Sequence, residues 1–236
     1  MSDQIKIPCL FMRGGTSRGP YFLKSDLPSD IEQRDKILLA AMGSPDIRQI
    51  DGLGGADPVK SKVAIISKSE EKNIDVDYHF AQVKIDEPIV DTKPSCGNML
   101  IGVGPASVER GLVNANNDKT KIVIRDVNTG MKIEEIVQTP GGEVSYDGDF
   151  KIDGVPNTGT PVEIRFLDSI GAKTKKLPGY KYTLARGKGR GGGATSHTAI
   201  SAGTPARPRP GRAWLLQLAR CCAARGLCRR TSSARR

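Results

Sequence analysis

Residues 93–104 read KPSCGNMLIGVG, and the rest of the chain can be arranged around this stretch. Pro94 and Ser95 end an extended segment, and an apolar run with helical character follows Cys96. A cysteine at the start of a helix lies beside unpaired backbone N–H groups and partial positive charge, which attract anions and activate a thiol. The stretch therefore predicts one wall of an active site.

The apolar run predicts a buried helix over residues 99–112, because its side chains are apolar on almost every face. Pro105 predicts a kink or a broken first turn in this helix. A second helix is expected at residues 31–42, with Gly43 as its end. Alternating or continuous apolar runs predict strands at residues 5–12, 20–23, 60–67, 74–85, 121–127, 132–138, 143–151 and 161–166. This pattern indicates an α+β fold, in which a curved, mostly antiparallel sheet wraps round a central helix.

The net charge of +10 is concentrated at the C-terminal end of the 236 residues. Residues 186–236 contain 12 Lys and Arg and no Asp or Glu, whereas residues 1–185 contain 24 basic and 26 acidic side chains. We expect a domain over residues 1–176 and a disordered Arg/Ala/Gly/Pro-rich tail over residues 177–236. The abrupt loss of acids favours a tail read out of frame; the alternative is a basic arm that binds nucleic acid.

The cysteine count and the apolar runs bear on the cellular compartment in which the protein is expected. Cys9 and Cys96 precede the tail, and two cysteines are too few for a disulfide framework. No N-terminal apolar run of the signal-peptide type is present, and no apolar run approaches the roughly 20 residues that a membrane span takes. We therefore expect a cytoplasmic protein without membrane contact. The residues before the tail contain one histidine, His79, and no closely spaced pair of cysteines. We therefore predict that there is no metal site.

Two glycine-rich segments precede the central stretch. Residues 13–19 (RGGTSRG) carry two arginines and two hydroxyls that can hold carboxylates; the alternative is a hairpin turn with solvated arginines. Residues 51–58 (DGLGGADP) match neither a Walker loop nor a dinucleotide fingerprint. Lys62 follows them at the start of a strand, where a lysine can act as a base in a cleft. The commoner alternative is a solvated lysine at a strand end.

Four motifs occur in order along the chain: CLFMRGGTSRG at 9–19, DGLGG at 51–55, TKPSCGNM at 92–99 and VNTG at 127–130. Together they resemble the 4-oxalomesaconate tautomerase and methylaconitate isomerase family, from about residue 5 to about residue 174. The resemblance implies one half of a diaminopimelate epimerase-like fold, whose second half forms the facing wall of a cleft. It also implies an isomerase that needs no cofactor and catalyses a 1,3-allylic proton shift (a keto–enol tautomerisation) of a tricarboxylate such as 4-oxalomesaconate.

The resemblance also assigns roles to residues. In this family a lysine after the glycine-rich loop is the base and a cysteine before the central helix assists it; these positions fall on Lys62 and Cys96. The first glycine-rich loop and the start of the helix would hold the substrate carboxylates. The substrate-binding residues expected on this basis are Arg13, Gly15, Thr16, Ser17, Ser95, Gly97 and Asn98.

The chain departs from the family where the second half would begin, because the arginine-rich tail stands there. We therefore expect a truncated site and little or no activity, since contacts that position the substrate would be missing. A methylaconitate or aconitate isomerase is one alternative, and a scaffold with a nucleic-acid-binding tail is another. The expected partner is a small di- or tricarboxylate; nucleic acid is expected at the tail only, and a homo-oligomer stays open.

Overall fold

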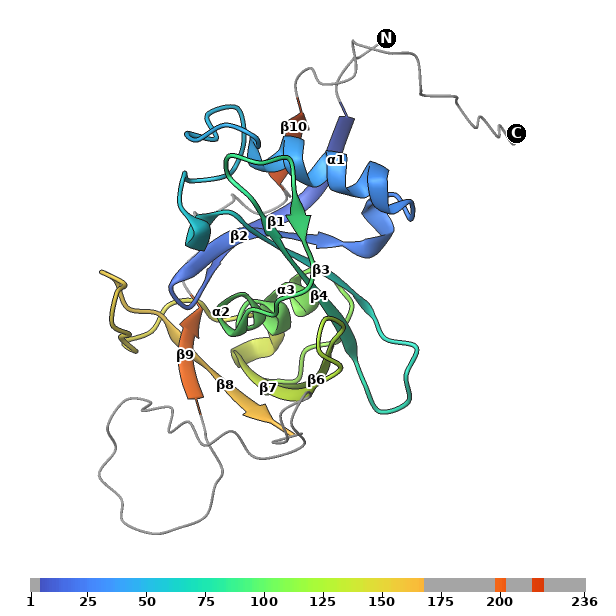
Figure 1. The fold of residues 1–236 in the computed structure, drawn as a ribbon. Helices are drawn as coiled ribbons and strands as arrows, with labels where there is room; N and C mark the ends of the chain where they lie inside the picture. The colour runs from blue at the N-terminus through green and yellow to red at the C-terminus, as the bar shows by residue number, and fades with distance from the viewer. Residues whose placement is uncertain (1–4, 168–197, 203–213, 219–236) are drawn as a thin grey trace, which may run out of the picture.

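The computed structural model describes residues 5–167, 198–202 and 214–218. In this part of the chain ten strands form one mixed sheet that curls around two short helices (Figure 1). The strands are β1 (Ile5–Gly14), β2 (Ser17–Leu23), β3 (Lys62–Lys68), β4 (Val76–Val83), β5 (Val90–Asp91), β6 (Asp118–Asp126), β7 (Lys132–Thr139), β8 (Thr160–Phe166), β9 (Thr198–Ala202) and β10 (Trp214–Leu218). The helices are α1 (Ile31–Met42), α2 (Gly97–Leu100) and α3 (Val103–Glu109), with 3-10 turns η1 (Lys24–Asp26), η2 (Pro58–Lys60) and η3 (Pro140–Gly142).

The order of the strands brings the two edges of the sheet together. The path is β10-β1-β2-β3-β4-β6-β7-β8-β9, and β9 also meets β1 where Ala202 pairs with Gly14. Strands β2 and β3, and strands β4 and β6, pair in parallel, whereas the other described pairings are antiparallel. The predicted α+β class, with a curved and mostly antiparallel sheet, is confirmed.

The pleat of the strands sorts their side chains between two cores. On the inner face, Tyr21, Ala64 and Tyr78 belong to a buried cluster that also contains the apolar residues of α2 and α3. On the outer face, Phe22 and Val63 are buried with the apolar side of α1. Neighbouring residues of one strand therefore serve different layers, and only inner-face residues can reach α2.

Helix α1 has the bounds that the sequence predicted. Its cap is Asp30, whose carboxylate accepts a hydrogen bond from the Gln33 N–H at 2.9 Å. Gly43 ends the helix with a φ of 76°, as glycine does at this position. The separate 3-10 turn η1 precedes the helix at Lys24–Asp26.

The central helix predicted over residues 99–112 is divided in two. Helix α2 ends at Leu100 and α3 begins at Val103, which leaves Pro105 within the first turn of α3, as a broken helix requires. The Tyr21 hydroxyl donates to the Met99 carbonyl at 2.7 Å. A side chain on Gly102 would lie 2.3 Å from that hydroxyl, so the break and its glycine make room for Tyr21.

The strand predicted at residues 143–151 is wrong. In this segment the structure has a single bridge, between Phe150 and Gly159. Asp147, Gly148 and Asp149 interrupt the apolar alternation, and these residue types are depleted in strands.

Most of the tail expected over residues 177–236 lies outside the described residues, and so does the predicted boundary at residue 176. Two short segments of it are described as strands: β9 pairs with β8, and β10 pairs with β1. Backbone groups along the edges of β1 and β8 accept such strands with little regard to their side chains.

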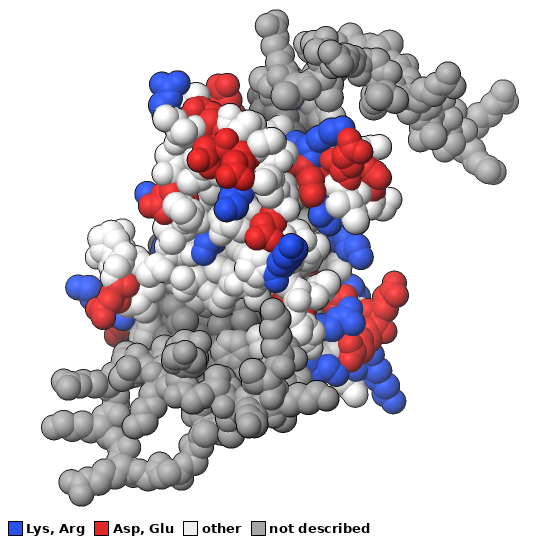
Figure 2. Space-filling model, viewed as in Figure 1, with Lys and Arg blue, Asp and Glu red and all other residues white. Residues whose placement is uncertain are grey.

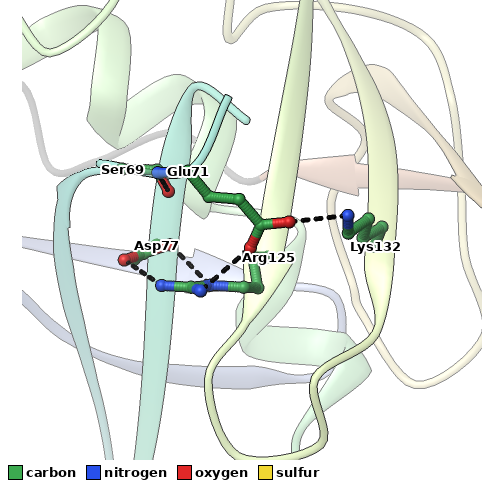
Figure 3. Close-up of polar contacts among 5 residues, drawn as sticks. All are labelled: Ser69, Glu71, Asp77, Arg125 and Lys132. Carbon is green, nitrogen blue, oxygen red and sulfur yellow. Dashed lines mark hydrogen bonds and ion pairs between the residues drawn. The ribbon is translucent and has the colours of Figure 1, made fainter. Parts of the chain in front are cut away.

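A cluster of ion pairs joins three strands of the sheet (Figure 3). Arg125 on β6 binds Asp77 on β4 through two hydrogen bonds, of 3.0 and 2.7 Å. Glu71 accepts from Arg125 at 3.0 Å and from Lys132 on β7 at 2.7 Å. Asp77 and Arg125 are also register partners, so the cluster fixes how β4 aligns with β6.

Candidate active site

Lys62 is the first residue of β3, and its side chain lies on the inner face of the sheet. Its Nζ lies 3.2 Å from Cys96 Sγ and donates to Ser17 Oγ at 3.1 Å. The same nitrogen lies 5.9 Å from the centre of the Phe80 ring, a favourable distance for a cation above an aromatic face. The lysine is half-buried, so the interpretation as a solvated lysine is wrong.

Cys96 immediately precedes α2 and is 8% exposed. Its carbonyl accepts the Leu100 N–H at 3.0 Å, which begins the helix, and the Tyr78 hydroxyl at 3.1 Å, which ties that carbonyl to β4. The backbone of the cysteine is thus held from two sides, and its thiol faces Lys62.

The turn between β1 and β2 closes this group from another side. Thr16 Oγ1 accepts a hydrogen bond from Asn98 Nδ2 at 2.9 Å, and Ser17 Oγ lies 3.5 Å from the same nitrogen. Gly15 has a φ of +55°, and a Cβ there would lie 2.4 Å from Asn98 Oδ1. The turn therefore needs glycine both for its conformation and for its contact with the start of α2.

Arg13, Ser95 and Gly97 are also expected substrate-binding residues, but their surroundings differ from those of Thr16, Ser17 and Asn98. Arg13 pairs with Arg18 across the hairpin, next to the Gly14–Ser17 pair, so its side chain leaves the opposite face of the sheet from Ser17. The Arg13 guanidinium donates to the Gly15 carbonyl at 2.6 Å, and burial lowers its pKa. Residues 13–19 are mostly strand around a two-residue turn, not an open loop.

Ser95 and Gly97 flank the cysteine but differ in surroundings. The Ser95 hydroxyl donates to the buried carboxylate of Asp126. Gly97 is exposed, and a Cβ added to it would meet no atom within 4 Å. Gly97 therefore borders open space beside Cys96, whereas Ser95 is engaged on the side of β6.

Two buried tyrosines were not recognised from the sequence as part of the site. Tyr21 and Tyr78 lie in the strands predicted at residues 20–23 and 74–85, but no pattern indicates what their hydroxyls bind. Burial raises the pKa of both hydroxyls well above the usual value, so they stay protonated and donate to the Met99 and Cys96 carbonyls. They anchor α2 to the inner face of the sheet.

The site thus links a thiol, an amine, two hydroxyls and an amide through successive contacts, from Cys96 through Lys62 and Ser17 to Asn98 and Thr16. Such groups can accept a proton, donate a proton and bind carboxylate oxygens. Within the described ranges, no three His, Cys, Asp or Glu side chains are placed to hold a metal ion. None of the described helices is long and apolar enough to cross a membrane.

Charge on the described surface is mixed. In the view of Figure 2, Lys and Arg side chains alternate with Asp and Glu side chains over the coloured residues. Ion pairs join opposite charges elsewhere among the described residues as well, such as Arg110 with Asp26 at 2.8 Å and Lys121 with Glu134 at 2.6 Å. This face of the domain is not the continuous basic surface typical of nucleic-acid binding.

A family model described as "PrpF protein" matches residues 4–206, which includes every described helix and every described strand except β10. The chain belongs to the PrpF family. The resemblance inferred from the four motifs is thereby confirmed, since the relatives of this PrpF chain carry the names that the motifs implied.

Two relatives illustrate the similarity. The (4E)-oxalomesaconate Delta-isomerase of Novosphingobium sp. is 57% identical over 170 residues, which cover 72% of this chain and 48% of the relative. The 4-oxalomesaconate tautomerase of Pseudomonas putida is 54% identical over 174 residues, covering 74% of this chain and 48% of the relative. The chain therefore spans about half the length of the curated relatives that it matches.

A solved structure agrees with this fold. The crystal structure of a methylitaconate-delta-isomerase superposes with a TM-score of 0.72 at 48% sequence identity, covering 74% of this chain and 45% of the other. The curled sheet around α2 and α3 is therefore shared with a protein that bears an isomerase name.

Proposed function

We propose that Lys62 and Cys96 are the proton-transfer pair of an isomerase that shifts a proton across an allylic system in a di- or tricarboxylate, with 4-oxalomesaconate as the first candidate. The observation that carries the proposal is the distance of 3.2 Å between Lys62 Nζ and Cys96 Sγ. The names of the relatives supply the substrate class.

The geometry suits a 1,3 shift. Lys62, as the free amine, removes a proton from the carbon next to a carbonyl or carboxylate, and the electron pair moves along the allylic system. Cys96 gives its thiol proton to the carbon at the other end. The resulting ammonium and thiolate are hydrogen-bonded neighbours, so one proton passes from Nζ to Sγ and restores both groups. No proton or electron is left over.

Side chains beside the pair bind the carboxylates in this proposal. Thr16, Ser17 and Asn98 present hydroxyl and amide groups next to Lys62. The open space at Gly97 leaves room for a carboxylate beside Cys96. The half-buried position of the pair strengthens electrostatic contacts with a bound anion.

The test is proton exchange. The chain is incubated with 4-oxalomesaconate in D2O, and NMR follows the entry of deuterium into the substrate, beside the full-length Novosphingobium relative. We expect exchange in this chain at a rate below that of the relative. Lys62→Ala and Cys96→Ser should abolish it, whereas Lys68→Ala, an exposed lysine at the other end of β3, should not. A chain that exchanges no deuterium contradicts the proposal.

The same experiment separates the substrates. Methylitaconate and methylaconitate replace 4-oxalomesaconate in parallel samples, and the substrate with the fastest exchange identifies the preferred acid. Equal exchange of all three would support a site that recognises only the shared carboxylates.

A further inference from the structure

The edge of β4 that faces β5 and β6 has a gap at Phe80. Strand β6 pairs with β4 at residues 76–78, and β5 pairs with it at residues 82–83, on either side of that gap. Neither strand supplies a backbone partner for Phe80. The segment that leads from β5 to Cys96 runs past this position.

The side chain of Asn128 fills the gap. Its Oδ1 accepts the Phe80 N–H at 2.8 Å, and its Nδ2 lies 2.9 Å from the Phe80 carbonyl oxygen. These are the two bonds that a neighbouring strand would make with a backbone peptide. The same Nδ2 lies 2.6 Å from the Thr92 carbonyl oxygen and 2.9 Å from that of Pro94. One amide therefore joins β4 to the segment before the cysteine.

Asp126 extends this hydrogen-bond network toward Cys96. Its carboxylate is 2% exposed; one oxygen accepts the Asn128 N–H at 2.9 Å and the other accepts the Ser95 hydroxyl. The residue directly before the cysteine is thus fixed to the end of β6. A buried carboxylate with two donors holds its geometry closely.

We propose that Asn128, with Asp126 behind it, is the positioning element that sets Cys96 opposite Lys62. Phe80 is the link on the lysine side, since its ring lies 5.9 Å from Lys62 Nζ while its backbone is bound by Asn128. Thr92, Pro94 and Ser95 are the links on the cysteine side. The inference rests on the proposed function of the pair and assigns a role to the VNTG motif, which the reaction itself does not use.

The test measures the proximity of the pair without a substrate. o-Phthalaldehyde condenses with an amine and a thiol that lie side by side and forms a fluorescent isoindole. The native chain is treated with this reagent, and peptide mapping follows the adduct that joins Lys62 to Cys96, with Cys96→Ser as the blank. We expect Asn128→Ala to form it about tenfold more slowly than the native chain, since several hydrogen bonds that hold the segment are lost. Asn128→Asp should be at least as slow, because its carboxylate would face three carbonyl oxygens.

The matched control is Asn117→Ala. Asn117 is an exposed asparagine whose side chain also accepts a backbone N–H, that of Gly141 at 3.0 Å, but it lies away from the cysteine. This variant should react at the native rate. All rates are taken where circular dichroism shows a native fold. If Asn128→Ala does not fold, Ser95→Ala decides, because Ser95 is an exposed residue outside the strands and its bond to Asp126 can be removed without opening the sheet.

The outcomes are distinct. A native rate of adduct formation in folded Asn128→Ala, or in Ser95→Ala when that variant decides, overturns the inference. A fast adduct in the native chain without deuterium exchange refutes the proposed function but leaves the positioning role standing. A native chain that forms no adduct refutes both.

Discussion

Lys62 and Cys96 are 34 residues apart in the sequence, yet Nζ and Sγ are 3.2 Å apart in the fold. Their meeting depends on how closely β2 approaches β3. A Cβ on Gly19 would lie 1.9 Å from the Lys62 carbonyl oxygen and 2.9 Å from its carbonyl carbon. The backbone of Lys62 therefore packs directly on the glycine.

Gly19→Ala should consequently displace the start of β3. We expect a loss of about 2 kcal/mol in the free energy of unfolding, since backbone atoms cannot yield as a flexible side chain does. The isoindole reaction between Lys62 and Cys96 should slow as well. Urea unfolding and peptide mapping measure the two effects.

Gly97→Ala is the control for stability, because no atom lies within 4 Å of an added Cβ. Its free energy of unfolding should stay within about 0.5 kcal/mol of the native value. Equal stability of Gly19→Ala and Gly97→Ala would show that β2 and β3 are less tightly packed than the structure has them.

Cys9 should behave as an inert thiol. It is 1% exposed on β1, and burial raises its pKa to about 11. At about pH 8 such a thiol is ionised to roughly one part in a thousand, and only the thiolate reacts with alkylating agents. We expect iodoacetamide to label Cys9 only after the chain unfolds, at a rate that follows urea concentration; peptide mapping measures it. Rapid labelling in the native chain would contradict its buried position.

Glu135 should make the stability of the domain depend on pH. Its carboxyl group is fully buried on β7; Oε2 accepts the Gly104 N–H at 3.0 Å, while Oε1 has no partner among the described residues. Burial raises its pKa well above the usual value of 4.5. The folded state therefore keeps the proton that the unfolded state releases, and stability falls as pH rises from about 4.5 toward the folded pKa.

Glu135→Gln removes this titration and keeps an oxygen for Gly104. Its free energy of unfolding should fall less steeply than that of the native chain between about pH 5 and pH 8. Glu143→Gln, an exposed residue, should retain the native slope. Urea unfolding at a series of pH values gives the slopes, and identical slopes for Glu135→Gln and the native chain would exclude a protonated Glu135.

The sequence predicted the α+β class and most of the strands, and the structure places Lys62 beside Cys96, whose catalytic roles stay a prediction. A helix start marked Cys96 on its own, whereas Lys62 was singled out with the help of the family resemblance of its motif. The sequence did not indicate which face of the sheet the Arg13 side chain leaves. A shift of one residue along a strand reverses that face, and the glycines after Arg13 gave no sign that the strand continues through it. Asn128 lies within a quoted motif, but its partners are 34 to 48 residues away in the chain. Such long-range hydrogen bonds leave no periodic signal in a single sequence.

The cluster around Arg125 should stabilise the domain in a manner that depends on salt and on acid (Figure 3). Arg125 binds Asp77 with two hydrogen bonds and shares Glu71 with Lys132. These contacts cross the parallel β4–β6 pairing, which has three register pairs. Arg125→Met should lower the melting temperature more in low salt than in high salt, because salt screens charges near the surface. Lys36→Met, which affects an exposed pair with Glu32 on α1, should have a smaller effect.

Lowering the pH tests the same cluster through the protonation of Glu71. Its hydrogen bond with Lys132, and then the charges of Lys132 and Arg125, hold the pKa of Glu71 below the usual 4.5. Because the folded pKa is the lower one, the stabilisation is present above about pH 4.5 and is lost as pH falls through the folded pKa. In Glu71→Gln the melting temperature should be lower at neutral pH and should fall less steeply below about pH 4.5. Differential scanning calorimetry across this range measures both. A variant that melts like the native chain at every pH would mean that the cluster forms without stabilising the β4–β6 pairing.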